Sequence, residues 1–286
     1  MGRDWFSKRP IGSLVDERAK RDGAREALVF EARRFTFAEL ARDIDAFARG
    51  LIALGIGPGD KVALWMPNRP EWVHAALAVM RIGAVLVPIN TRLRTEDAAY
   101  VLDQSDSTAL IIAARSGPVD YLAMACELLP SLASGGVGLR DARLPALRRV
   151  MVLGDAPAPG ALAWLALLEA GARVPDDVSR KHRRGRPGWD GLHYLHLRNH
   201  GLPEGRDALS QHSRNVVDRA YRMAITPADT ILMYLPLYHL YGFSEGLLMS
   251  MVTGARQLVS QSFDATESLR LLERNGNRPL RLRHAF

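Results

Sequence analysis

Short apolar runs alternate with longer amphipathic stretches along the first 113 residues. The stretch from Phe35 to Leu54 places apolar side chains at the spacing of one helix face and breaks at Gly55. Apolar runs at 61–66, 84–90 and 108–113 have the length of strands, and residues 68–83 and 95–105 between them have that of helices. This alternation predicts crossover units, in which helices cover both faces of a largely parallel sheet.

The pattern loosens into a Gly/Ser/Pro-rich region after Ala113 and becomes regular again near the residues 148–154, which form a strand in this scheme. A helix over 159–171 follows, and residues 230–260 have the pattern strand, loop, helix, strand. A further helix begins near Asp264 or Thr266, either of which is a suitable cap. We expect the class α/β.

Two residues stand at the start of the predicted helix over 68–83. Asn68 is placed to cap its first turn with the side-chain oxygen. Pro70 lies inside the first turn, where its missing N–H costs nothing. The sequence therefore assigns Asn68 a local role at this helix terminus.

Composition adds bounds on size and compartment. The chain has 286 residues, 48% hydrophobic and 24% charged, which is the range of a globular protein of one large or two ordinary domains. Its one cysteine, Cys126, lies in a helical pattern, excludes an internal disulfide and is expected to be a small buried hydrophobe. The first ten residues have no apolar run typical of a signal peptide. We expect a cytoplasmic protein.

One region of the chain is apolar enough to suggest a membrane span. The residues 231–255 are apolar, but Pro236, His239, Gly242 and Glu245 interrupt them. A buried strand, loop and helix explain these interruptions better than a span does. We expect no membrane span.

The formal net charge of +7 is unevenly distributed. Residues 181–214 contain seven Lys or Arg against three acids, and residues 274–286 contain four Arg and no acid. Each segment therefore contributes +4, so the rest of the chain sums to −1. Five of the eight histidines also lie between His182 and His212, in a stretch without any apolar period.

Three phrases in order resemble a known family. "FTFAEL", "GIGPGDKVALWMPNRPEWVHAALAVMRIGAVLVPINTRL" and "YLPLYHLYGF" are similar to the N-terminal portion of the adenylate-forming acyl-CoA synthetases, the AMP-binding ligases. The resemblance implies the N-terminal part of the adenylate-forming ligase fold, with mostly parallel sheets flanked by helices, and incomplete. Such enzymes activate a carboxylic acid with ATP to an acyl-adenylate and transfer the acyl group to coenzyme A.

The family binds ATP phosphates and Mg²⁺ with a loop of the type Tyr-Thr-Ser-Gly-Thr-Thr-Gly-x-Pro-Lys-Gly. Here residues 195–205 read "LHLRNHGLPEG" at the corresponding place, just before the similar helix that begins near Arg214. One permitted set of codons for these residues, shifted by one base, encodes Tyr-Thr-Ser-Gly-Thr-Thr-Gly-Phe-Pro-Lys-Gly. We infer that residues of about 181–213, and from about 275 onward, are translated out of frame.

The resemblance also implies site residues. The His of "LPLYHLYGF" lies at the acyl pocket in relatives, so His239 is the expected substrate-binding residue, with Tyr241 and Gly242 shaping the turn. We expect no catalytic, nucleotide-binding or metal residue, because the loop has lost its lysine and hydroxyl run and Glu204 would repel phosphate. In the family the adenine-binding segment, the hinge and the C-terminal catalytic lysine come later than Phe286. The resemblance thus implies ATP, Mg²⁺ and CoA as cofactors, but none is expected to bind productively.

Two alternatives concern the histidine-rich segment. Spacings of three and four place His193, His196 and His200 on one face of a helix, as for metal ligands, but Gly201 and Pro203 argue against a helix. The basic residues with Trp189 and Tyr194 suit a nucleic-acid arm of a non-catalytic binding module.

The expected division is an N-terminal α/β region over 1–180, an out-of-frame basic segment over 181–213, a continuation of the AMP-binding domain over 214–274 and an out-of-frame tail over 275–286. The expected function is a fragment of an ATP-dependent acyl-CoA synthetase, acting by family on a small carboxylic acid and inactive as it stands.

Overall fold

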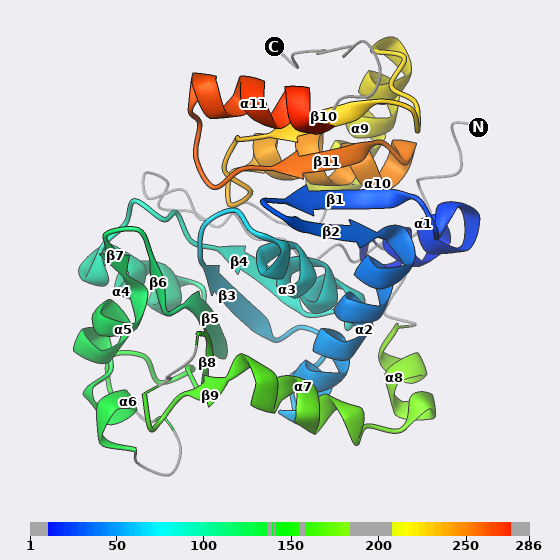
Figure 1. Cartoon of the computed structure of the whole chain (residues 1–286). Coiled ribbons are helices and arrows are strands. Elements are labelled where there is room, and N and C mark those ends of the chain that lie inside the picture. Colours follow the sequence, from blue (N-terminus) through cyan, green and yellow to red (C-terminus); the bar gives the residue numbers. More distant parts are fainter. Residues whose placement is uncertain (1–10, 136–138, 140, 155–157, 184–207, 276–286) are drawn as a thin grey trace.

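Two large sheets, a two-stranded hairpin and their helices build one large hydrophobic core in a computed structural model that describes residues 11–135, 139, 141–154, 158–183 and 208–275 (Figure 1). The strands are β1 (Glu26–Phe30), β2 (Arg33–Thr36), β3 (Lys61–Trp65), β4 (Val85–Pro88), β5 (Ala109–Ala113), β6 (Arg115–Ser116), β7 (Val119–Asp120), β8 (Arg149–Leu153), β9 (Leu162–Ala163), β10 (Thr230–Met233) and β11 (Arg256–Val259). The helices are η2 (Ile11–Ser13), α1 (Leu14–Asp22), α2 (Phe37–Ala53), α3 (Pro70–Arg81), α4 (Thr95–Gln104), α5 (Tyr121–Leu128), α6 (Pro130–Ser134), α7 (Trp164–Ala172), α8 (Asp176–Arg183), α9 (Ala208–Arg222), η3 (Gly242–Leu248), α10 (Met249–Thr253) and α11 (Ala265–Asn275).

The larger sheet has the strand order β4-β3-β5-β8-β9, and every neighbouring pair in it is parallel. Helix α3 connects β3 to β4, and α4 connects β4 to β5, as in the crossover units predicted from the sequence. Strand β5 is buried along its whole length because it lies inside the sheet and is covered on both faces. The predicted α/β class and the largely parallel sheet are confirmed.

The smaller sheet joins the two ends of the described chain. Its strand order is β10-β11-β1-β2, with β1 parallel to β11 and antiparallel to β2. On one face, Val29 of β1 and Leu258 of β11 pack with Leu232 of β10 and with Leu272 of α11. The opposite face carries Gln257, whose side chain reaches η3, so η3 and α11 lie on opposite faces of this sheet.

Helix α3 lies between the two sheets (Figure 1), and all twelve of its residues are buried. A helix enclosed on every side needs an apolar surface around its whole circumference, and "WVHAALAVM" provides it. Its neighbour α2 instead buries one face, with Leu40, Ile44 and Phe47 fully buried. Helix α2 begins at a capping box in which Thr36 and Glu39 bind each other's backbone N–H.

Asn68 does not cap α3, so this portion of the sequence prediction is wrong. The cap position belongs to Arg69, whose side chain makes no capping hydrogen bond. Pro70 is in the first turn as predicted. The Asn68 side chain turns instead to a loop more than 160 residues away, because that loop leaves buried backbone groups for it to satisfy.

Other local predictions have mixed outcomes. Asp264 caps α11 by accepting the Glu267 N–H at 2.7 Å, which settles the choice left open with Thr266. Cys126 lies in α5 as predicted and is half-buried, and its burial raises the pKa of the thiol. Among the described residues, no helix has the length and apolarity to cross a membrane.

The polar residues of α3 are held by ion pairs because the helix is enclosed. Glu71 accepts hydrogen bonds from Arg33 at 2.7 Å and from Arg69 at 2.8 Å. Burial alone would raise the pKa of Glu71, but these hydrogen bonds outweigh it and the pKa lies below its ordinary value. His74 is buried with its Nε2 3.7 Å from an oxygen of Asp43 and its ring against Phe35. Burial lowers the pKa of His74 to about 4.

We predict that His74 makes the protein less stable in mild acid. The unfolded chain binds a proton at this side chain near pH 6.5 and the folded chain only near pH 4, so the free energy of unfolding falls as pH decreases through this window. The loss attributable to His74 is roughly 3 kcal/mol when the window has been crossed. Urea unfolding of wild type and His74→Gln at several pH values measures it.

The wild type and His74→Gln are compared by how their free energies of unfolding change with pH, since Asp43 and Glu71 titrate in both proteins. Burial raises the pKa of Asp43, so this carboxyl contributes to the acid dependence of both proteins. The glutamine variant should lack the His74 component and have a shallower curve between pH 6.5 and 4. Parallel curves would contradict the assignment.

Candidate functional site

The loop that follows β10 carries the predicted site residue His239. This loop runs from Tyr234 to Tyr241 and turns at Pro236, whose carbonyl accepts the His239 N–H at 3.0 Å. The His239 ring is exposed, and its Nδ1 accepts the backbone N–H of Tyr241 at 3.2 Å. A nitrogen that accepts a hydrogen bond has no proton, so the neutral ring carries its proton on Nε2. His239 therefore offers one N–H donor.

A π-helix, η3, begins immediately after the loop. Its first residue, Gly242, packs so closely that a Cβ there would lie 2.2 Å from the Pro236 carbonyl oxygen. The buried Gln257 side chain donates to the carbonyls of Gly246 and Leu247 at 3.2 and 3.3 Å. The close contact thus lies at the start of η3, and the Gln257 amide lies near its end.

A cavity of about 260 Å³ lies where the loop, η3 and α9 meet. Its lining residues are Asn215, Arg219, His239, Leu240, Tyr241, Ser244 and Glu245. The buried Glu245 carboxylate accepts a hydrogen bond from Arg219 at 2.6 Å, which neutralises the charge at this wall. Burial raises the pKa of Tyr241, so its phenol is a neutral donor or acceptor at pH 7.

The structure places the three predicted residues together. His239 and Tyr241 line the cavity, and Gly242 forms the turn beside it. Their role in binding a substrate stays a prediction. Arg219 and Glu245 were missed, because they are 26 residues apart on different helices and neither lies in a pattern that points to a site.

Asn68 fixes the same loop from the opposite side. Its amide nitrogen donates to the carbonyls of Leu235 at 2.8 Å and Ser260 at 3.1 Å. Its oxygen accepts the Leu237 N–H at 2.8 Å. The side chain is 3% exposed, so these hydrogen bonds are shielded from water.

The other predicted sites fall elsewhere. The loop over 195–205 and the histidines His193, His196 and His200 lie outside the described residues. Within the described ranges, no group of three or more His, Cys, Asp or Glu side chains is arranged to hold a metal ion.

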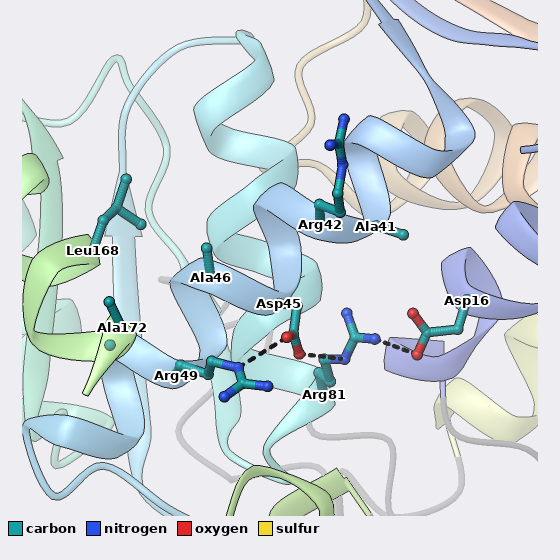
Figure 2. A pocket seen from close by; sticks show the side chains of 10 residues that line it. Asp16, Ala41, Arg42, Asp45, Ala46, Arg49, Arg81, Leu168 and Ala172 are labelled. Atoms are coloured by element: carbon teal, nitrogen blue, oxygen red, sulfur yellow. Dashed lines mark hydrogen bonds and ion pairs between the residues drawn. The ribbon is translucent and has the colours of Figure 1, made fainter. Parts of the chain in front are cut away.

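A second cavity, of about 370 Å³, lies beside α2, α3 and α7 (Figure 2). Four of the five charged residues that line it are connected: Arg81 pairs with Asp16 and approaches Asp45, and Arg49 binds Asp45 at 3.0 Å. The fifth, Arg42, lies apart from them and approaches Glu39. Arg49 also pairs with Asp176 and donates to the Val174 carbonyl. Since acids of the protein already neutralise Arg49 and Arg81, this cavity is a poor site for an external anion.

Comparison with known proteins supports the resemblance found in the sequence. Residues 15–142 match the sequence profile described as AMP-binding enzyme. These residues are thus similar to AMP-binding enzymes. The chain is also 30% identical over 276 residues to the medium-chain acyl-CoA ligase ACSF2 of rat mitochondria, covering 92% of this chain and 45% of that protein.

A ligase from Mycobacterium tuberculosis gives a similar result. The 3-[(3aS,4S,7aS)-7a-methyl-1,5-dioxo-octahydro-1H-inden-4-yl]propanoyl:CoA ligase is 30% identical over 270 residues, covering 93% of this chain and 50% of the ligase. The chain thus spans about half the length of the curated relatives it matches, and the match falls on their N-terminal portion.

Solved structures of AMP-binding enzymes share the fold. The anthranilate CoA ligase AuaEII, in complex with anthranoyl-AMP, superposes with a TM-score of 0.74 at 18% identity, covering 96% of this chain and 50% of the ligase. A long-chain-fatty-acid-CoA ligase from Archaeoglobus fulgidus gives 0.70 at 18% identity, with 94% and 50% covered. The fold is therefore that of the N-terminal portion of adenylate-forming ligases.

We predict that Gly242→Ala destabilises the protein more than Gly246→Ala. The Gly242 Cβ would meet the backbone of Pro236, so the loop or η3 must move, at a cost of about 1–3 kcal/mol. At Gly246 the nearest atoms belong to the end of the Met233 side chain, which can rotate away. Urea unfolding of the two variants measures the difference. An equal or larger loss in Gly246→Ala would contradict the assigned role of the Pro236 contact.

Proposed function

We propose that this chain is a fragment of an ATP-dependent acyl-CoA synthetase and that the cavity beside His239 is the remnant of its carboxylic-acid site. The family match over residues 15–142 supports the class of enzyme. The observation that carries the site is the joint position of His239, Leu240 and Tyr241 at one cavity. An apolar side chain next to a ring N–H and a phenol suits an acid that has an apolar body and an oxygen-rich end.

The proposed roles follow from the geometry. The Nε2–H of His239 would donate to an oxygen of the bound acid, since Nδ1 is occupied by the Tyr241 N–H. Tyr241 and Gly242 would fix the wall and the turn of the cavity. The rat relative is named a medium-chain acyl-CoA ligase, so medium-chain carboxylic acids are the first substrates to test.

The described residues do not fit the other cofactors of the reaction. The cavity is lined by one cation, Arg219, and Glu245 already neutralises it. A triphosphate with Mg²⁺ needs several donors and cations, and no lysine lines this cavity. We therefore derive no step through ATP, Mg²⁺ or CoA.

The absence of activity is proposed from the sequence of the loop. Residues 195–205 contain no Lys, Ser or Thr, although the family uses these residues to bind phosphate, and Glu204 adds a negative charge. This composition is explained if residues 181–213, which separate the α/β region over 1–180 from its continuation over 214–274, are translated out of frame. The same explanation applies to residues 275–286.

The proposed compartment is the cytoplasm.

The gene sequence across codons 175–290 tests the frame. We expect a gained or lost base near codons 180 and 212, with the family loop restored in the corrected frame. Because the chain around the segment stays in the family frame, two compensating changes are required. A confirmed, transcribed sequence identical to the present one would contradict the proposal.

We predict that the purified chain shows no acid-dependent exchange between pyrophosphate and ATP above a buffer blank. The reason is that no lysine or hydroxyl run remains to hold the departing pyrophosphate. Exchange is measured with octanoate, and a full-length acyl-CoA synthetase serves as the positive control under the same conditions. Exchange that depends on octanoate would refute the proposed inactivity.

A non-catalytic module that binds nucleic acid is the competing function. Its support is the local charge of +4 over residues 181–214. A DNA titration at rising salt separates the two proposals. Binding that persists at moderate salt and is lost on deletion of residues 181–213 would favour the module.

A further inference from the structure

The side chain of Asn68 sits where two strands of the smaller sheet separate. Strands β10 and β11 pair as far as Met233 and Val259, and the Ser260 N–H still donates to the Met233 carbonyl at 2.9 Å. Beyond this point the ladder stops and the two chain segments separate. The Asn68 amide nitrogen then donates to one carbonyl beyond each strand, that of Leu235 after β10 and that of Ser260 after β11.

The same side chain also controls the direction of the loop after Pro236. The Leu237 N–H donates to the Asn68 oxygen, and the Leu237 side chain is completely buried. Two of these three hydrogen bonds therefore hold the backbone on either side of Pro236. The amide donates two hydrogen bonds and accepts one here, whereas a hydroxyl has only one donor, a carboxylate has none and an ammonium group cannot accept.

His239 comes two residues after Leu237, and its ring orientation depends on the backbone that follows. Its Nδ1 meets the Tyr241 N–H only if the turn from Pro236 to Tyr241 keeps its present shape. This hydrogen bond is what leaves the ring proton on Nε2. The loop conformation and the available donor are thus linked.

We propose that Asn68 is a positioning residue for His239. By bonding the backbone at Leu235, Leu237 and Ser260, it holds the loop in the one shape that keeps the Nε2–H tautomer. The benefit for ligand binding rests on the proposed function, in which the cavity holds the oxygen-bearing end of a carboxylic acid. The effect on the His239 ring does not depend on any ligand.

Two variants of Asn68 separate its functions. Asn68→Asp keeps the size of the side chain and one acceptor, but it loses both donors and faces two carbonyls. Asn68→Ala removes all three hydrogen bonds. The matched control is Ser107→Ala, which removes a similarly buried hydrogen bond, that to the Ser105 hydroxyl at 2.6 Å, between α4 and β5.

The readout is the ring of His239 in ¹⁵N-labelled protein. Its two ring nitrogens are assigned by their loss in His239→Gln, and each tautomer gives its own pattern of nitrogen shifts. We expect the Nε2–H pattern in wild type and in Ser107→Ala at pH 8. Both Asn68 variants should give the averaged pattern of a ring that exchanges between tautomers.

Folding is verified by thermal melting of each variant. If Asn68→Ala does not melt cooperatively, Asn68→Asp and Ser107→Ala carry the comparison. A His239 pattern unchanged in the folded Asn68 variants would overturn the proposal. The same change in Ser107→Ala would also overturn it, since the effect would then be general.

Octanoate titration forms the second arm. We expect the dissociation constant to rise about tenfold in Asn68→Asp and in His239→Gln, and to stay within twofold of wild type in Ser107→Ala. Wild type that does not bind octanoate would refute the proposed acid site, whereas the tautomer comparison would still decide the role of Asn68. Wild-type binding with unchanged affinity in Asn68→Asp would contradict the positioning role alone.

Discussion

The enclosure of α3 between two sheets is the constraint on which the rest of the structure depends. Since all twelve residues of this helix are buried, every charged or polar side chain on it requires a partner from a neighbouring element. Glu71 pairs with Arg33 of β2, and Arg81 pairs with Asp16 of α1 and approaches Asp45 of α2. The ion pairs that α3 makes thus follow from one packing arrangement.

The same enclosure connects the helix to the candidate site. Asn68 lies between β3 and α3, and its side chain reaches the loop after β10. Trp72 on α3 packs edge-on against Phe243 of η3, with ring centroids 6.2 Å apart. The N-terminal crossover unit therefore supports a loop that comes about 160 residues later.

The elements that the sequence predicted well are those with a local cause. The parallel strands β3, β4 and β5 have short apolar runs, and α2 and α4 have a clear helical period. The hairpin of β1 and β2 was missed because β2, "RRFT", is short and mostly polar, and because β1 depends on pairing with the distant strand β11. The π-helix could not be foreseen either, since the contacts of Gly242 with Pro236 and of Gln257 with Gly246 leave no mark on the periodicity of the sequence. Within the site, His239 and Tyr241 belong to one short phrase, whereas Arg219, Glu245 and Asn68 meet only after folding.

The pairing of β1 with β11 has a consequence for synthesis of the chain. Strand β1 ends at Phe30, and its neighbour β11 begins at Arg256, so 226 residue positions separate the two. At about 5–20 residues per second, a ribosome needs roughly 10–45 s to cover this distance. During that time the strands of the larger sheet can already associate, while β1 has only β2 as a partner. Nascent chains therefore display an apolar strand edge for seconds to tens of seconds, which makes this strand a natural target for chaperones.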